Sequence, residues 1–146
     1  MNSVNAIISA LAVCFVGCGV HEIKPIDIFA EDVCSNCRMA ISDDRFAGEI
    51  ITVDREVFKF DDIGCMELFE ERQHGMKIAA RFVRTFESTA WIPYEKSIIL
   101  ETTVTTPMGS GKIAFADSTK AQAFARQRDD SATGTRMDGR SPEGHE

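Results

Sequence analysis

The strongest constraint on the fold is a short pattern that occurs twice in the sequence. Phe60-Asp61-Asp62 is followed by Phe69, nine residues after the first phenylalanine. Phe115-Ala116-Asp117 is followed by Phe124 at the same spacing. Each copy is typical of a strand end, an acidic helix cap and a helix that carries a phenylalanine. A unit of this size is too small to bury its own core. We therefore expect an α+β fold in which two small, related β-β-α units pack together.

The rest of the sequence predicts the strands and helices of the domain. The predicted strands are 47–53, 57–60, 79–86, 97–106 and 113–115, and the predicted helices are 63–73 and 117–128. Residues 54–56 are predicted to form a hairpin turn, and the aromatic stretch 91–94 is expected to be an irregular link. We predict a folded domain over 34–128, with units of about 34–90 and 91–128. Residues 129–146 are polar and without apolar periodicity, which predicts a disordered tail.

The N-terminus predicts a membrane anchor. Residues 4–17 are mostly apolar but too short to span a bilayer comfortably, which is typical of the core of a secretory signal. Phe15-Val16-Gly17-Cys18 resembles the lipobox of bacterial lipoproteins. We expect a signal peptide over 1–17, lipidation of Cys18 and a tether over 18–33. The alternative is a buried N-terminal helix. Lipidation would place the domain in an extracytoplasmic, oxidising compartment.

A sulfur-rich motif, Cys34-Ser35-Asn36-Cys37-Arg38-Met39, opens the predicted domain. Thiolates and thioethers are soft ligands, which select Cu(I) among biological metals. If the segment is extended, Cys37 and Met39 point to the same side. The chain has five cysteines, and only Cys34, Cys37 and Cys65 lie in the folded part. An odd number is not a disulfide framework and indicates a free or metal-bound thiol. The net charge of −7 argues against a nucleic-acid partner.

The motif leaves alternatives open. Cys34 and Cys37 have the spacing of a redox pair, although no helix pattern opens at the second cysteine. A zinc site would need Cys65 and His74 to complete four ligands. A third interpretation is a scaffold with buried sulfurs, and Cys65 is expected to be a core residue on its predicted helix. Met108 lies in a glycine-rich turn, which makes it either a third Cu(I) ligand or a packing residue.

Three motifs in order resemble the NosL family of accessory lipoproteins of nitrous-oxide reductase. They are Cys34-x-x-Cys37-x-Met39, Phe60-Asp61-Asp62-Ile63-Gly64-Cys65-Met66 and Thr106-Pro107-Met108-Gly109-Ser110-Gly111 with Ala114-Phe115, behind the lipobox. The resemblance covers about residues 30–128. It implies a fold of two related β/α units and Cu(I) binding by Cys37 and Met39, with Met108 in the second motif and Cys34 as a further candidate. The family usually has glycine where this chain has Arg38.

The resemblance also implies a function. We expect a Cu(I)-binding chaperone without enzymatic activity, anchored to the periplasm-facing membrane by its lipid, with the outer membrane favoured over the inner. It would pass copper by ligand exchange to the machinery that matures a periplasmic copper enzyme. The implied partners are an ABC-transporter-type complex and nitrous-oxide reductase. The alternative function is that of an extracytoplasmic thiol-disulfide oxidoreductase that uses Cys34 and Cys37.

Overall fold

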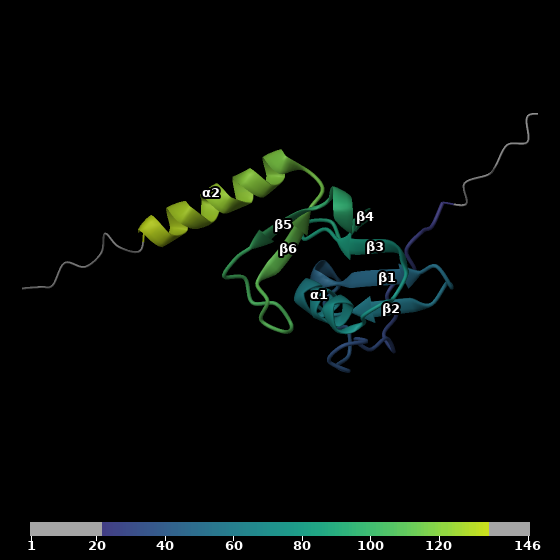
Figure 1. The fold of residues 1–146 in the computed structure, drawn as a ribbon. Helices are drawn as coiled ribbons and strands as arrows, with labels where there is room; N and C mark the ends of the chain where they lie inside the picture. The colour runs from purple at the N-terminus through teal and green to yellow at the C-terminus, as the bar shows by residue number, and fades with distance from the viewer. Residues whose placement is uncertain (1–21, 135–146) are drawn as a thin grey trace, which may run out of the picture.

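The computed structural model describes residues 22–134. The predicted signal peptide, the lipidation site at Cys18 and the last residues of the predicted tail lie outside this range. Within it the fold is α+β, as predicted, with six strands, two α-helices and two short 3₁₀ helices (Figure 1). None of the described helices combines the length and the apolar character needed to cross a bilayer.

The first half of the chain forms a four-stranded antiparallel sheet. Its strands are β1 (Gly48–Thr52), β2 (Val57–Phe60), β3 (Ile78–Arg84) and β4 (Trp91–Pro93), in the order β2-β1-β3-β4. The helix α1 (Ile63–Arg72) follows β2 directly and contacts both β1 and β2. The short 3₁₀ helices η1 and η2 are Asp44–Phe46 and Tyr94–Lys96.

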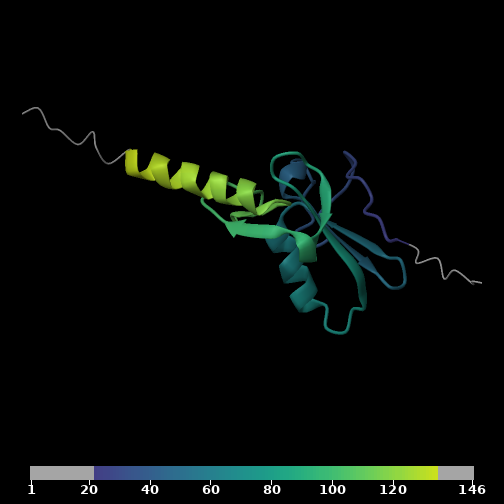
Figure 2. The same ribbon diagram turned by 90° about the horizontal axis from the view of Figure 1, so that it is seen from above.

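The second half repeats the order strand, strand, helix. The hairpin of β5 (Ile98–Glu101) and β6 (Lys112–Phe115) leads into α2 (Ser118–Gly134). Figures 1 and 2 show α2 projecting from this hairpin, away from the four-stranded sheet. The two β-β-α sequences predicted from the repeated pattern are therefore present as β1-β2-α1 and β5-β6-α2.

Three boundaries differ from the predictions. The strand β5 ends at Glu101, so residues 102–106 of the predicted strand lie outside it. Residues 91–93 form β4 where an irregular link was expected, and β4 pairs with β3, so the first sheet continues beyond residue 90. The helix α2 continues to Gly134, so the predicted disordered tail begins inside it. The polar composition of residues 129–134 gives no apolar period, but the helix, capped by Asp117, continues through them.

Two buried clusters form the core, and β6 contributes to both. Ala114 belongs to the cluster under α1, which also contains Ile50, Phe60 and Met66. Its neighbours in β6 belong to the second cluster, where they pack with Phe46, Ala121 and Phe124. Alternate residues of a strand point to opposite faces, so one short strand joins the two halves of the core.

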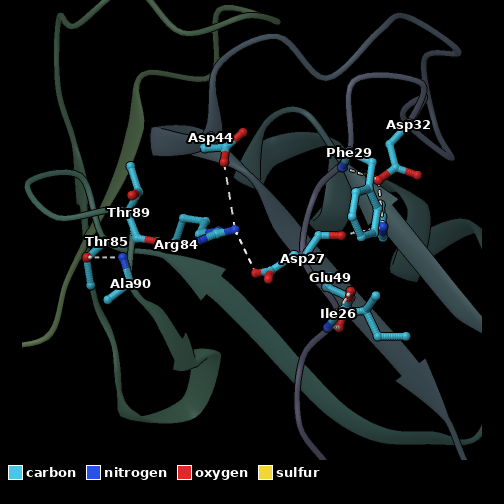
Figure 3. A network of polar contacts seen from close by, with 11 residues as sticks. Ile26, Asp27, Phe29, Asp32, Asp44, Glu49, Arg84, Thr85, Thr89 and Ala90 are labelled. Carbon is cyan, nitrogen blue, oxygen red and sulfur yellow. Dashed lines mark hydrogen bonds and ion pairs between the residues drawn. The ribbon is translucent and has the colours of Figure 1, made fainter.

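Residues 26–32, which lie within the predicted tether, dock on the sheet through polar contacts (Figure 3). The backbone N–H of Ile26 donates to both carboxylate oxygens of Glu49, at 3.0 and 3.2 Å. Asp27 forms an ion pair with Arg84, and Lys59 forms one with Asp32 at 2.6 Å. These contacts fix the chain that leads to the sulfur motif.

Candidate metal centre

The sulfur motif is a tight turn and not the extended segment that its sequence allowed. The backbone N–H of Cys34 donates to the Met39 carbonyl at 2.8 Å, and the Arg38 N–H donates to the Cys34 carbonyl at 3.0 Å. The N–H of Ser35 donates to the Lys59 carbonyl at 2.8 Å, which ties the turn to β2. The turn points Cys34 into the core, where it is fully buried, and leaves Cys37 half-buried.

Arg38 adopts a left-handed backbone conformation within this turn, with φ 65°. This region is unfavourable for residues with a Cβ and suits glycine. We expect Arg38→Gly to raise the free energy of unfolding by about 0.5 kcal/mol, since relief of strain exceeds the extra entropy of the unfolded chain. Urea denaturation measures this change. Arg38→Ala keeps the strain and serves as control; a Gly variant less stable than the Ala variant would contradict the prediction.

The start of α1 brings two more donor groups to the turn. Asp62 caps the helix, because its Oδ1 accepts from the Gly64 N–H at 2.7 Å. Cys65 then lies in the first helical turn, where side chains lean back toward the N-terminus. Asp61, directly before the cap, is 1% exposed, and Cys65 is 2% exposed.

Four ligand atoms meet at this point. The sulfurs of Cys34, Cys37 and Cys65 and a carboxylate oxygen of Asp61 all lie within 4.8 Å of one another. Two ligands bound to one tetrahedral ion at about 2.3 Å lie about 3.8 Å apart, so a contraction of about 1 Å would suffice to bind a metal ion. We call these four residues the sulfur cluster. All three cysteines are free thiols.

The surroundings of Cys37 and Cys65 favour the protonated form of these two thiols. Burial raises the pKa of Cys37, and its contacts with Cys34 and Asp61 raise it further, while the Met39 N–H works in the opposite direction. Burial also raises the pKa of Cys65, and a hydrogen bond from Asn36 opposes that rise only in part. A bound cation would have to displace these protons, so affinity should increase with pH.

The two carboxylate oxygens of Asp61 differ in whether they have a hydrogen-bond partner. The Cys37 thiol donates to Asp61 Oδ2 at 3.4 Å. Asp61 Oδ1 is buried and has no hydrogen-bond partner among the described residues. An orphan carboxylate oxygen beside three thiols is the kind of group that a cation would satisfy.

An amide positions the third sulfur. Asn36 Nδ2 donates to Cys65 Sγ at 3.4 Å, and Arg72 donates to the Asn36 Oδ1 at 3.1 Å. The contact links the motif turn to α1. Groups that orient a ligand in this way are typical of metal sites.

The two methionines predicted as ligands occupy exposed positions. The side chain of Met39 is 55% exposed, and that of Met108 is 46% exposed. The Met108 turn is fixed by its backbone, because its N–H donates to Asp62 Oδ2 at 3.1 Å. The helix cap therefore positions this turn as well as α1. Both thioethers are accessible to a binding partner.

The sequence interpretation missed two members of the cluster. The acidic pair predicts a helix cap, but only Asp62 caps α1, and Asp61 faces the thiols. Cys65 is a core residue, as expected, and it is also one of the four donors. The signal was present in the sequence: a cap at Asp62 places Cys65 three residues into the helix, leaning toward Asp61.

The geometry does not favour a thioredoxin-like site. Such a site exposes a thiol with a lowered pKa at the start of a helix. Here Cys34 is buried, the pKa of Cys37 is raised, and both lie in a turn. The donor set suits a soft or borderline metal ion.

Sequence comparison identifies the protein family. The model of the NosL family matches residues 25–133, which contain the whole sulfur cluster, the helix cap and the Met108 turn. The chain belongs to the NosL family. No curated protein matches it in sequence.

The fold is similar to a solved NosL structure. That structure is described as the crystal structure of the copper chaperone NosL from Shewanella denitrificans. The TM-score is 0.60 at 21% sequence identity, over 71% of this chain and 87% of that chain. The similarity confirms the fold expected for a NosL-family chain.

Proposed function

We propose that this NosL-family protein is a Cu(I)-binding metallochaperone and not an enzyme. The observation that carries the proposal is the sulfur cluster, in which three thiols and a carboxylate meet beside an exposed methionine. Thiolate and thioether ligands favour Cu(I) over harder cations. The structural neighbour is described as a copper chaperone, which supports the same class of function.

The mechanism is ligand exchange without a change in oxidation state. Cys37 and Met39 hold Cu(I) at the open side of the cluster, and Met108 offers a further thioether from the neighbouring turn. Each thiol that binds the ion releases one proton. A partner's sulfur ligands then displace these donors one at a time, which transfers the ion without releasing it to water.

We propose that the carrier acts at the periplasm-facing membrane. The predicted lipid on Cys18 would hold it there, with the outer membrane favoured, and the docked part of the tether, residues 26–32, would fix the domain close to its anchor. The client is a copper enzyme of the periplasm, in the first place nitrous-oxide reductase, reached through an ABC-transporter-type maturation complex. The acidic character of the chain would contribute to the choice of partner.

Met39→Leu tests the proposal, because leucine keeps the shape of methionine and removes its sulfur. We expect the affinity for Cu(I) to fall about tenfold, as is usual when a contributing ligand or its support is lost. The measurement is an anaerobic competition titration against a chromophoric Cu(I) chelator. The full chain in detergent is used, in a Cys14→Ser, Cys18→Ser background.

Met137→Leu is the matched control, since this methionine lies in the C-terminal tail and is expected to be inert. Cys34→Ser, Cys37→Ser and Met108→Leu are titrated alongside. Weak binding by the parent chain would reject the copper function. Activity in a disulfide-exchange assay that requires both Cys34 and Cys37 and tolerates Met39→Leu would favour the alternative oxidoreductase.

A further inference from the structure

The donors around the motif turn differ in depth. Cys34, Cys65 and Asp61 are at most 2% exposed. Cys37 is half-buried, and the Met39 side chain is 55% exposed. The cluster thus has a closed side and an open side, and Cys37 stands between them, within 4.8 Å of every inner donor.

The inner side carries two features that packing alone does not require. A buried cysteine of an apolar core needs no amide donor, yet Asn36 donates to Cys65 and is itself oriented by Arg72. Asp61 Oδ1 is a fully buried oxygen without a partner among the described residues, in a cluster where the other carboxylate oxygen accepts from Cys37. A bound cation would satisfy a buried oxygen of this kind.

The position of Cys65 also suits a metal-bound thiolate. It lies in the first turn of α1, where the helix dipole places partial positive charge. This field and the Asn36 amide both stabilise negative charge on the sulfur. The first turn of α1 and the Asn36 amide therefore both suit a metal-bound thiolate at this position.

We propose that the centre has two positions for the ion: an inner one formed by Cys34, Cys65 and Asp61, and an outer one formed by Cys37 and Met39. The inference rests on the proposed Cu(I) carrier and adds a closed holding position to it. Cys37 remains bound to the ion while the ion moves, so only the other ligands of the ion are exchanged. Each newly bound thiol gives up one proton, and copper stays Cu(I) throughout.

The two positions would serve different purposes because their donors differ in burial. The inner position protects the ion from water and oxidants, because its donors are covered by the core. The outer position is where a partner's sulfurs reach the ion, because Met39 is exposed. Asp61 neutralises part of the charge on the ion, and the ion becomes the partner of the Asp61 Oδ1.

Cys65→Ser is the decisive variant, because serine keeps the size of the side chain and removes the soft donor. We expect a 10- to 100-fold loss of Cu(I) affinity in the anaerobic competition titration, on the full chain in detergent and in the Cys14→Ser, Cys18→Ser background. X-ray absorption at the copper edge should count three sulfur neighbours in the parent chain and two in the variant. Asp61→Asn should lower the affinity about tenfold with the sulfur count unchanged.

Met66→Leu is the control. Met66 follows Cys65 in α1 and is completely buried, and its sulfur lies against Gly48 of β1. It should keep the affinity and the sulfur count of the parent chain. Cys65→Ala is measured in addition, and circular dichroism confirms that each compared variant is folded.

The outcomes separate the two proposals. Failure of the parent chain to bind Cu(I) rejects the chaperone function itself. Tight binding by the parent chain with only two sulfur neighbours overturns the inner position and leaves the function standing. Unchanged affinity and sulfur count in folded Cys65→Ser or Cys65→Ala does the same.

Discussion

Asp62→Ala should lower the free energy of unfolding by about 3 kcal/mol and the melting temperature by about 10 °C. Asp62 is completely buried and joins two segments that are 44 residues apart in sequence. Its Oδ1 caps α1 at the Gly64 N–H. Its Oδ2 accepts from the Thr106 hydroxyl at 2.6 Å and from the Met108 N–H at 3.1 Å. Alanine removes the cap and deprives the Thr106 hydroxyl and the Met108 N–H of this acceptor.

The same hydrogen bonds govern the charge of Asp62. Burial alone would raise its pKa, but hydrogen bonds from Ser110, Thr106 and two backbone N–H groups outweigh burial and hold the pKa below its usual value. An acid whose pKa is lowered on folding contributes stability above its unfolded pKa, and that stability is lost as pH falls through the folded pKa. The difference between the parent chain and the Ala variant should therefore shrink below about pH 4.

Asp117→Ala is the matched control for this prediction. Asp117 caps α2 through the Thr119 N–H at 2.6 Å, but it is exposed and holds no second segment. Its loss should destabilise the protein much less than the loss of Asp62. Chemical denaturation followed by circular dichroism measures both variants. Equal effects would show that Asp62 acts only as a helix cap and that the Met108 turn does not depend on it.

The role of Asp62 illustrates how far the sequence determines this fold. A strand, an acidic pair and an amphipathic helix are local signals, so β2, the cap and α1 were predicted at nearly their observed positions. The second copy of the pattern predicted β6 and the start of α2 for the same reason. The short strand β4 was missed because its three residues depend on pairing with β3, which no local pattern records.

The candidate site was predictable only in part. The spacing of Cys34 and Cys37 identified the motif, but the turn depends on Arg38 adopting a conformation that its residue type disfavours. Asp61 and Asp62 have the same side chain, so the sequence does not show which of them caps the helix and which faces the thiols. Cys65 enters the cluster only because the cap fixes the first turn of α1 against the motif.

Glu49→Gln should stabilise the protein at pH 8 by about 2 kcal/mol and have little effect at pH 5. Glu49 lies in β1 between Lys59 and Phe82 of the neighbouring strands and is completely buried beneath the docked N-terminal segment (Figure 3). Burial raises the pKa of Glu49 from 4.5 to about 7, and the negative charge of Asp27 adds to this rise. The hydrogen bond from Ile26 and the positive charges of Lys59 and Arg84 lower the pKa and offset the rise only in part.

The sign follows from proton linkage. The folded state holds the proton more tightly than the unfolded state, so it binds more protons between pH 4.5 and about 7. The contribution of Glu49 is therefore fully present below pH 4.5 and declines as pH rises to about 7, above which the carboxylate is buried as an anion. The pKa difference corresponds to roughly 3 kcal/mol, which we reduce to about 2 kcal/mol because water reaches the docked segment.

Glutamine separates charge from hydrogen bonding, since its amide oxygen still accepts from the Ile26 N–H while the side chain stays neutral at every pH. The measurement is the free energy of unfolding from urea denaturation at pH 5, 6, 7 and 8, for the parent chain and the variant. Glu56→Gln is the control, because Glu56 is exposed in the adjacent turn and its replacement changes the net charge equally. Parallel pH profiles for the parent chain and Glu49→Gln would contradict the prediction. A profile of the parent chain that falls with rising pH, beside a flatter one for the variant, would locate a titrating carboxyl under the segment that leads to the candidate metal centre.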